Sequence, residues 1–305
     1  MNIGIMLGST PDPEASLDKF VSVALDVEAR GFSSLWLAHI RGHDAIIAMG
    51  LAARETKALE VGTAVTPIQP RHPTALAQET LTAQAMARGR FTLGVGLSHQ
   101  VVIEDMLGLS YARPAQTMRE YLKVLCPLLN GQESHYEGEL YQVNFGLSVN
   151  DAIKPVPVII AALGPMMLQV AGAFSDGTCL WMTGPKTIAS HVVPRLNEAA
   201  ELVGNPSRRV VAGFPVLLTN DEKKGRAVIA SQLARYGQLP SYRAMLDRES
   251  LSGPSDIALV GGENVIKQQI ETIREAGATD FIAALIETGD GSSTRTLDFL
   301  TELNA

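Results

Sequence analysis

Histidines and small residues follow several apolar runs of this chain, and two of their patterns invite a chemical interpretation. His39 and His43 have helical spacing, as in a metal-binding helix, but they straddle a glycine and lack the glutamate of HExxH. Ser98 and His99 are neighbours in sequence, without the surrounding GxSxG of a serine hydrolase. Acidic residues are scarce at the ends of the runs, so a carboxylate pair is not expected either. The sequence therefore predicts neither a metal site nor a hydrolase.

The segment ALGPMM at residues 162–167 has the pattern of a phosphate-binding turn. An apolar run reaches a glycine, and a helix then begins with proline near its first position. Free N–H groups at such a start attract a phosphate, and Gly164, Met166 and Met167 would donate them. Lys186, after the next apolar run, could add a positive charge. An ordinary helix start is the alternative. With the small, neutral run ends, this turn indicates a flat, largely uncharged cofactor with a phosphate tail.

The stretch GTAVTPIQPRHP at residues 62–73 contains three prolines, at positions 67, 70 and 73. It begins as an apolar strand and leads into an apolar helix. Prolines are costly inside regular elements, so they stiffen a turn here. A plain connector needs no such stiffness, which raises the question of what the turn supports.

The elements that must position these residues alternate along the chain. Near-continuous apolar runs are typical of strands buried on both faces, as in a parallel sheet covered by helices. The expected strands are residues 2–7, 34–39, 60–65, 91–97, 157–163, 177–182, 210–218 and 280–287.

Helical patterns separate these runs. Apolar residues recur every three or four positions within 17–27, 122–129 and 266–273. Ser16, Asp44 and Asp221 stand where N-caps belong, and Gly31 and Gly277 follow helical runs, as C′ glycines do.

Eight strands, each followed by a helix, predict an α/β fold, a (β/α)8 TIM barrel. A doubly wound open sheet usually has fewer strands, and Gly94-x-Gly96 lacks the third glycine of its fingerprint. We expect a single domain over residues 1–305. Residues 130–156 are expected to form an inserted hairpin, and residues 236–258 a second insertion; loops of this length are usually lids or oligomer contacts.

The composition is that of a globular protein with a sizeable core. Of 305 residues, 46% are hydrophobic and 19% charged, with a net charge of −7. No run of lysine and arginine stands out, which argues against nucleic-acid binding. Cys126 and Cys179 are interpreted as buried thiols. The sequence has neither signal-peptide features nor a stretch long enough to span a membrane, so a cytoplasmic location is expected.

Four segments together resemble the luciferase-like flavin and deazaflavin oxidoreductases. They are GTAVTPIQPRHP, RFTLGVGLSH, ALGPMMLQVAGAFSDG and VGGENVIKQQIETIREAGATDFIAA. The resemblance covers essentially the whole chain, and the sequence is most similar to enzymes that use the deazaflavin coenzyme F420. It implies a TIM barrel with insertions, often a homodimer, that acts on a small-molecule substrate.

The resemblance also implies roles for individual residues. A bulge, often with a non-prolyl cis peptide, would support one face of the cofactor ring, with Thr66 at the ring edge and His39 at the reacting edge. His99 would replace a catalytic acid or only bind. The candidate cofactor-binding residues are Thr63, Ala64, Val65, Thr66, Gly96, Ser98, Gly164, Met166, Met167 and Lys186.

Two departures from the family pattern leave the substrate open. Ala38 stands where the family often has an acid, and Ser98-His99 stands where some dehydrogenases have a glutamate. We therefore do not assign a sugar-phosphate substrate. The leading hypothesis is an F420-dependent oxidoreductase that transfers a hydride to or from an organic molecule. The alternatives are an FMN-dependent monooxygenase and a barrel that binds a ligand or cofactor without turnover.

Overall fold

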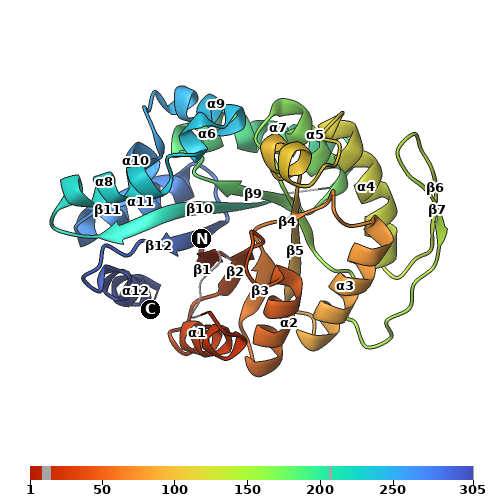
Figure 1. The fold of residues 1–305 in the computed structure, drawn as a ribbon, viewed down its shortest axis with the longest axis horizontal. Helices are drawn as coiled ribbons and strands as arrows, with labels where there is room; N and C mark the ends of the chain where they lie inside the picture. The colour runs from red at the N-terminus through yellow and green to blue at the C-terminus, as the bar shows by residue number, and fades with distance from the viewer. Residues whose placement is uncertain (9–14, 206–207, 305) are drawn as a thin grey trace.

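A closed barrel of eight parallel strands forms the centre of the computed structural model, which describes residues 1–8, 15–205 and 208–304 (Figure 1). Strand β12 pairs with β1 and β9 with β10, which closes the circuit. The barrel strands are β1 (Asn2–Gly8), β2 (Ser34–Ala38), β3 (Glu60–Thr63), β5 (Phe91–Gly96), β8 (Val158–Ala161), β9 (Gly177–Trp181), β10 (Arg209–Leu218) and β12 (Asp280–Leu285). All eight expected strands are present, and the predicted TIM barrel is confirmed.

Helices cover the outside of the barrel between successive strands. The longer ones are α1 (Leu17–Ala29), α2 (Ala45–Glu55), α3 (Pro73–Met86), α4 (Pro114–Leu129), α5 (Pro165–Phe174), α7 (Val193–Glu201), α8 (Glu222–Gln232), α11 (Glu263–Glu275) and α12 (Ser292–Asn304). The side chains of Ser16, Asp44 and Asp221 accept hydrogen bonds from the first turns of α1, α2 and α8, as predicted. None of the described helices combines the length and apolarity needed to cross a membrane.

The barrel interior is layered, because alternate residues of each strand point inward. Near the amino ends of the strands, the Arg209 guanidinium pairs with Glu60 and Asp280. Its Cζ atom lies 5.3 Å from the centre of the Trp36 ring, which begins an apolar layer. The other buried members of that layer are Ile159, Cys179, Val211 and Ile282.

Both predicted insertions are present, but only the first has the expected structure. Strands β6 (Ser134–Glu137) and β7 (Gln142–Phe145) form an antiparallel hairpin, at the right edge of Figure 1. Residues 236–258 are largely helical instead of forming one long loop. They contain a 3₁₀ turn (Tyr236–Gln238), α9 (Pro240–Glu249) and α10 (Pro254–Ile257). A proline at the start of each α-helix favours these helices. Strand β11 (Leu259–Gly261) then pairs with β10.

Candidate active site

The floor of the barrel mouth is formed by a bulge after β3. The peptide bond between Ala64 and Val65 is cis, where the resemblance implies it. Both residues are half-buried and, with Met6, pack on the apolar layer of the interior. Opposite them, a Cβ at Gly96 would lie 2.5 Å from the Val65 Cγ2 atom. Gly94 and Gly96 therefore let the bulge lie close to β5, and none of the residues at this floor carries a charge.

Two threonines of this segment, Thr63 and Thr66, are shielded from solvent. Thr63 is fully buried; its hydroxyl donates to the Gly94 carbonyl at 2.7 Å and accepts from the Gly94 N–H at 2.9 Å. Thr66 is also fully buried, in the short strand β4 (Thr66–Pro67), and its hydroxyl has no partner among the described residues. Thr63 therefore joins the bulge to β5.

The proline-rich turn connects this floor to its neighbours. The Ile68 N–H donates to the Gly96 carbonyl at 3.0 Å, and the Gln69 amide donates to the Leu97 carbonyl at 2.9 Å. Arg71 reaches Asp44 at the start of α2, with 2.7 Å between Nη2 and Oδ2. The turn therefore joins β5 to α2 across the bulge. The stiff turn therefore supports the floor by holding the bulge between these two elements.

His39, immediately after β2, is held by the first turn of α2. Its Nδ1 accepts a hydrogen bond from the Ala45 N–H at 3.2 Å, and the N-cap Asp44 fixes that turn through hydrogen bonds to the next two backbone amides. In the neutral ring the proton must then sit on Nε2, which has no partner among the described residues. His39 therefore presents a hydrogen-bond donor.

The surroundings of His39 favour its neutral form. Burial, and then the positive charge of Arg71, lower its pKa, while Asp44 opposes them. The Asp44 Oδ2 atom is 3.8 Å from the imidazole but only 2.7 Å from Arg71, so Arg71 takes up most of its charge. A second proton on Nδ1 would also face the Ala45 N–H. Asp44 was predicted only as an N-cap, and Arg71 was not among the predicted site residues because only the fold brings it to His39.

His99 lies after β5 among aromatic rings. Ser98 before it has a left-handed backbone, with φ of +57°. The His99 ring is edge-on to Tyr242 at 5.9 Å and to Tyr236 at 6.2 Å between ring centres. Burial lowers the pKa of His99. The neutral form of its ring is therefore favoured, and this form can accept a proton at this edge of the mouth.

The start of α5 can accept an anion. Gly164 is its N-cap without a capping side chain, and apart from its chain neighbours nothing lies within 4 Å of the position that a Cβ would take there. Met166 is 62% exposed and Met167 half-buried, so the first turn is near solvent. The backbone N–H groups of an uncapped helix start attract phosphate.

The corresponding start of α6 (Pro185–Thr187) is already filled. The Thr187 N–H donates to the Glu249 carboxylate at 2.5 Å, and a Cβ at Gly184 would lie 2.4 Å from the Glu249 Cδ atom. Lys186 is exposed beside this contact. The chain's own acid thus occupies the anion position of α6, whereas that of α5 is open.

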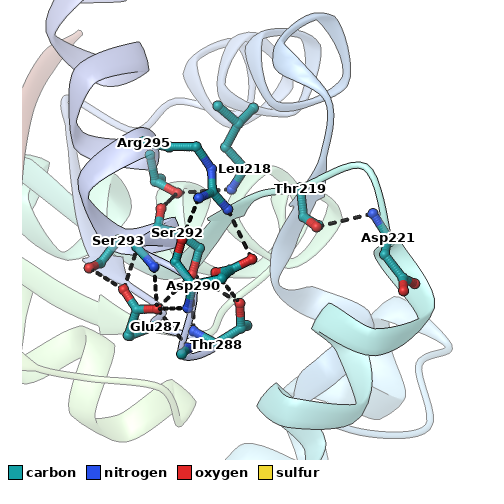
Figure 2. Close-up of polar contacts among 12 residues, drawn as sticks. Leu218, Thr219, Asp221, Glu287, Thr288, Asp290, Ser292, Ser293 and Arg295 are labelled. Carbon is teal, nitrogen blue, oxygen red and sulfur yellow. Dashed lines mark hydrogen bonds and ion pairs between the residues drawn. The ribbon is translucent and has the colours of Figure 1, made fainter.

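The acid that follows the last barrel strand has a structural role. Figure 2 shows Glu287 turned toward the loop that begins α12. Its carboxylate accepts from the Ser293 hydroxyl at 2.6 Å and from the Gly289 and Asp290 N–H groups at 2.7 and 3.0 Å. These hydrogen bonds, that of Ser293 foremost, lower its pKa. Glu287 caps the loop and is not placed for acid chemistry.

The mouth fits a flat, uncharged ring with an anionic tail. The uncharged floor beside Gly96 and the open start of α5 match such a group. Within the described ranges, no three His, Cys, Asp or Glu side chains gather as a metal site would need.

Comparisons with known proteins agree with this geometry. Residues 1–280 match the family model of the luciferase-like monooxygenases. The F420-dependent glucose-6-phosphate dehydrogenase of Kineococcus radiotolerans is 25% identical over 264 residues, which is 82% of this chain and 77% of that protein.

Two solved structures share the fold over 99% of this chain and 97% of their own. An F420-dependent secondary alcohol dehydrogenase with an F420–acetone adduct superposes with a TM-score of 0.82 at 18% identity. The oxygenating constituent of a Pseudomonas putida 3,6-diketocamphane monooxygenase, in complex with FMN, gives 0.77 at 15%. The chain therefore belongs to the luciferase-like monooxygenase family.

Proposed function

We propose that the protein is an F420-dependent oxidoreductase that transfers a hydride between the deazaflavin and a small organic substrate. The observation that carries the proposal is the uncharged floor of Ala64, Val65 and Gly96 with an open helix start beside it. A relative with the same cofactor in its name, the Kineococcus dehydrogenase, supports F420 over other flat rings. When bound, the coenzyme supplies the hydride chemistry.

The chain supplies position, charge and protons. Ala64 and Val65 support the ring, and the N–H groups of the first turn of α5 bind the phosphate tail. The Nε2–H of His39 donates to the substrate oxygen on which negative charge develops. His99, whose ring makes no hydrogen bond among the described residues, accepts the hydroxyl proton when an alcohol is oxidised, and its imidazolium returns that proton when a carbonyl is reduced. Two histidines thus take two roles, because α2 fixes the tautomer of only one.

The main alternative is an FMN-dependent monooxygenase on the same barrel. The FMN-bound Pseudomonas structure shares the fold, and the floor accepts either ring. A barrel that binds without turnover is the second alternative, and it predicts that His39 can be replaced without consequence. The homodimer implied by the resemblance stays a prediction.

An anaerobic activity assay tests the proposal. Purified protein is mixed with reduced F420 and a set of aldehydes and ketones, or with oxidised F420 and the matching alcohols. Absorbance at 420 nm follows the coenzyme. We expect turnover without oxygen for at least one pair. Turnover only with reduced FMN and oxygen would favour the monooxygenase instead.

Replacing Lys186 by alanine is expected to weaken F420 binding by about 1–3 kcal/mol if the ammonium bonds the phosphate. The lysine is exposed beside the filled start of α6, and the proposal requires its ammonium to reach the tail bound at α5. Fluorescence titration measures the affinity. Lys57→Ala, at an exposed lysine just before β3, is the matched control. Equal affinity in both variants would remove Lys186 from the site.

Gly96→Ala is expected to weaken cofactor binding about tenfold or more, because overpacking typically costs ~1–3 kcal/mol. The new methyl would lie 2.5 Å from the Val65 Cγ2 atom and push the floor upward. Gly262→Ala is the control, since nothing lies within 4 Å of its Cβ position. An unchanged affinity, measured by the same titration, would show that the ring does not rest on this floor.

A further inference from the structure

Four aromatic rings meet at the barrel mouth, although they come from three distant parts of the chain. His99 follows β5, Trp181 ends β9, and Tyr236 and Tyr242 belong to the second insertion. Tyr236 is central: its ring centre is 5.1 Å from Tyr242, 6.2 Å from His99 and 6.3 Å from Trp181. Figure 1 shows α9, which carries Tyr242, beside α6 at the upper edge of the view.

This aromatic wall faces the interior of the barrel. The Trp181 side chain lies against β10, where its Cε3 atom is 3.2 Å from the Cβ position of Gly213. The raised pKa of Tyr242 arises from burial, then from Tyr236 and from Cys179, a residue of the apolar layer. Tyr242 meets His99 after β5 and Tyr236, whose ring in turn meets Trp181 at the end of β9, so α9 covers the carboxyl ends of these two strands. The wall stands over the same mouth as the floor of Ala64 and Val65.

Two charged side chains of the second insertion, Arg243 and Glu249, bind groups other than the aromatic rings. Arg243 donates to the Ser252 carbonyl at 2.7 Å and pairs with Asp247 at 2.8 Å. Glu249 is bound to the Thr187 N–H. Neither group is available to neutralise a charged ligand, and the proposed function assigns Lys186 and the start of α5 to the phosphate tail of the coenzyme. Burying an unpaired charge against aromatic rings is unfavourable, so the wall selects against ionic ligands.

One polar atom of the wall lacks a partner. The Trp181 Nε1 atom is buried and has no hydrogen-bond acceptor among the described residues. Buried indole N–H groups usually find one. An oxygen of a bound molecule can supply it, while its carbon skeleton packs on the rings.

We propose that His99, Trp181, Tyr236 and Tyr242 form the substrate site, and that it takes an uncharged, ring-bearing organic compound with one hydrogen-bond-accepting oxygen. Tyr242 determines specificity because it brings the insertion over the mouth. The proposal rests on the proposed function for the reaction itself. It goes further in excluding phosphorylated and carboxylated substrates.

Ligand-observed NMR on the F420-loaded protein tests the site with three probes of one shape: acetophenone, benzoate and phenyl phosphate. We expect acetophenone to bind at least about tenfold more tightly than either anion. Tyr242→Ala should lower the affinity for acetophenone about tenfold. Tyr242→Phe keeps the ring and should retain the affinity. Tyr136→Ala, in the hairpin, is the control. Tighter binding of an anion, or equal binding by Tyr242→Ala, would overturn the proposal.

A second variant keeps the test valid if Tyr242→Ala unfolds. Trp181→Phe removes the N–H and should weaken the binding of acetophenone. The binding of ethylbenzene, which has no oxygen, should change little. Equal losses for both probes would contradict the assigned hydrogen bond. An F420 titration on the same samples separates the two claims. Coenzyme binding without acetophenone binding would overturn the aromatic site alone. Acetophenone binding that depends on Tyr242, without coenzyme binding, would support the site and overturn the proposed function.

Discussion

His39→Ala is expected to slow hydride transfer by about 10²–10³-fold, the usual cost of losing one donor to a developing oxyanion. F420 affinity should stay within about threefold, because His39 faces the reacting edge and not the phosphate. The rate should fall because the variant lacks the Nε2 donor, which the hydrogen bond from the Ala45 N–H to Nδ1 fixes in the wild type. Single-turnover absorbance at 420 nm measures the rate.

Two further variants make this result specific. His39→Gln places an amide N–H near the position of Nε2 and should recover part of the rate. His135→Ala, in the exposed hairpin, should have no effect. In the wild type the rate should fall only below the ordinary histidine pKa of about 6.5, since the pKa of His39 is lowered. An unaffected rate in His39→Ala would support binding without turnover.

Asp280→Ala is expected to destabilise the barrel by about 3–5 kcal/mol, because it leaves the buried charge of Arg209 short of a partner. Asp280 is 2% exposed and is 2.7 Å from the guanidinium. Denaturant unfolding measures the loss. The control is Asp298→Ala, which breaks a surface pair with Arg30 at a side chain 54% exposed. It should cost under about 1 kcal/mol.

The same pair predicts a pH dependence. Burial alone would raise the pKa of Asp280, but the hydrogen bonds and charge of Arg209 outweigh it and lower the pKa. A lowered folded-state pKa gives stability that is present above the unfolded value of about 3.9 and is lost as pH falls below it. The gap between wild type and Asp280→Ala should therefore narrow in acid. A gap constant from pH 7 to pH 3 would show that the charge pair does not carry the effect.

The barrel could be predicted from sequence because its signals are local. Runs such as residues 91–97 are apolar on both faces, and N-caps such as Asp44 stand directly before their helices. The floor could be placed for the same reason, since strand ends mark the mouth of any such barrel. The cis bond at Ala64–Val65 came from the resemblance, as no local pattern shows it.

The partners of the site could not be predicted, because they depend on packing between distant segments. Nothing near Asp44 in sequence indicates Arg71, and nothing near Thr187 indicates Glu249. The insertion at 236–258 was expected as a loop, and its tyrosines had no visible role until α9 placed Tyr242 beside His99. Prolines at its helix starts were the one available signal.

Titration of the purified protein with F420 and, separately, with FMN tests the central claim most directly. Trp181 lies in the mouth and Trp36 in the layer beneath, so tryptophan fluorescence reports on a bound ring. We predict micromolar binding of F420, FMN binding at least about tenfold weaker, and a smaller signal in Trp181→Phe. Tighter binding of FMN, or binding of neither coenzyme, would contradict the assignment as an F420-dependent oxidoreductase.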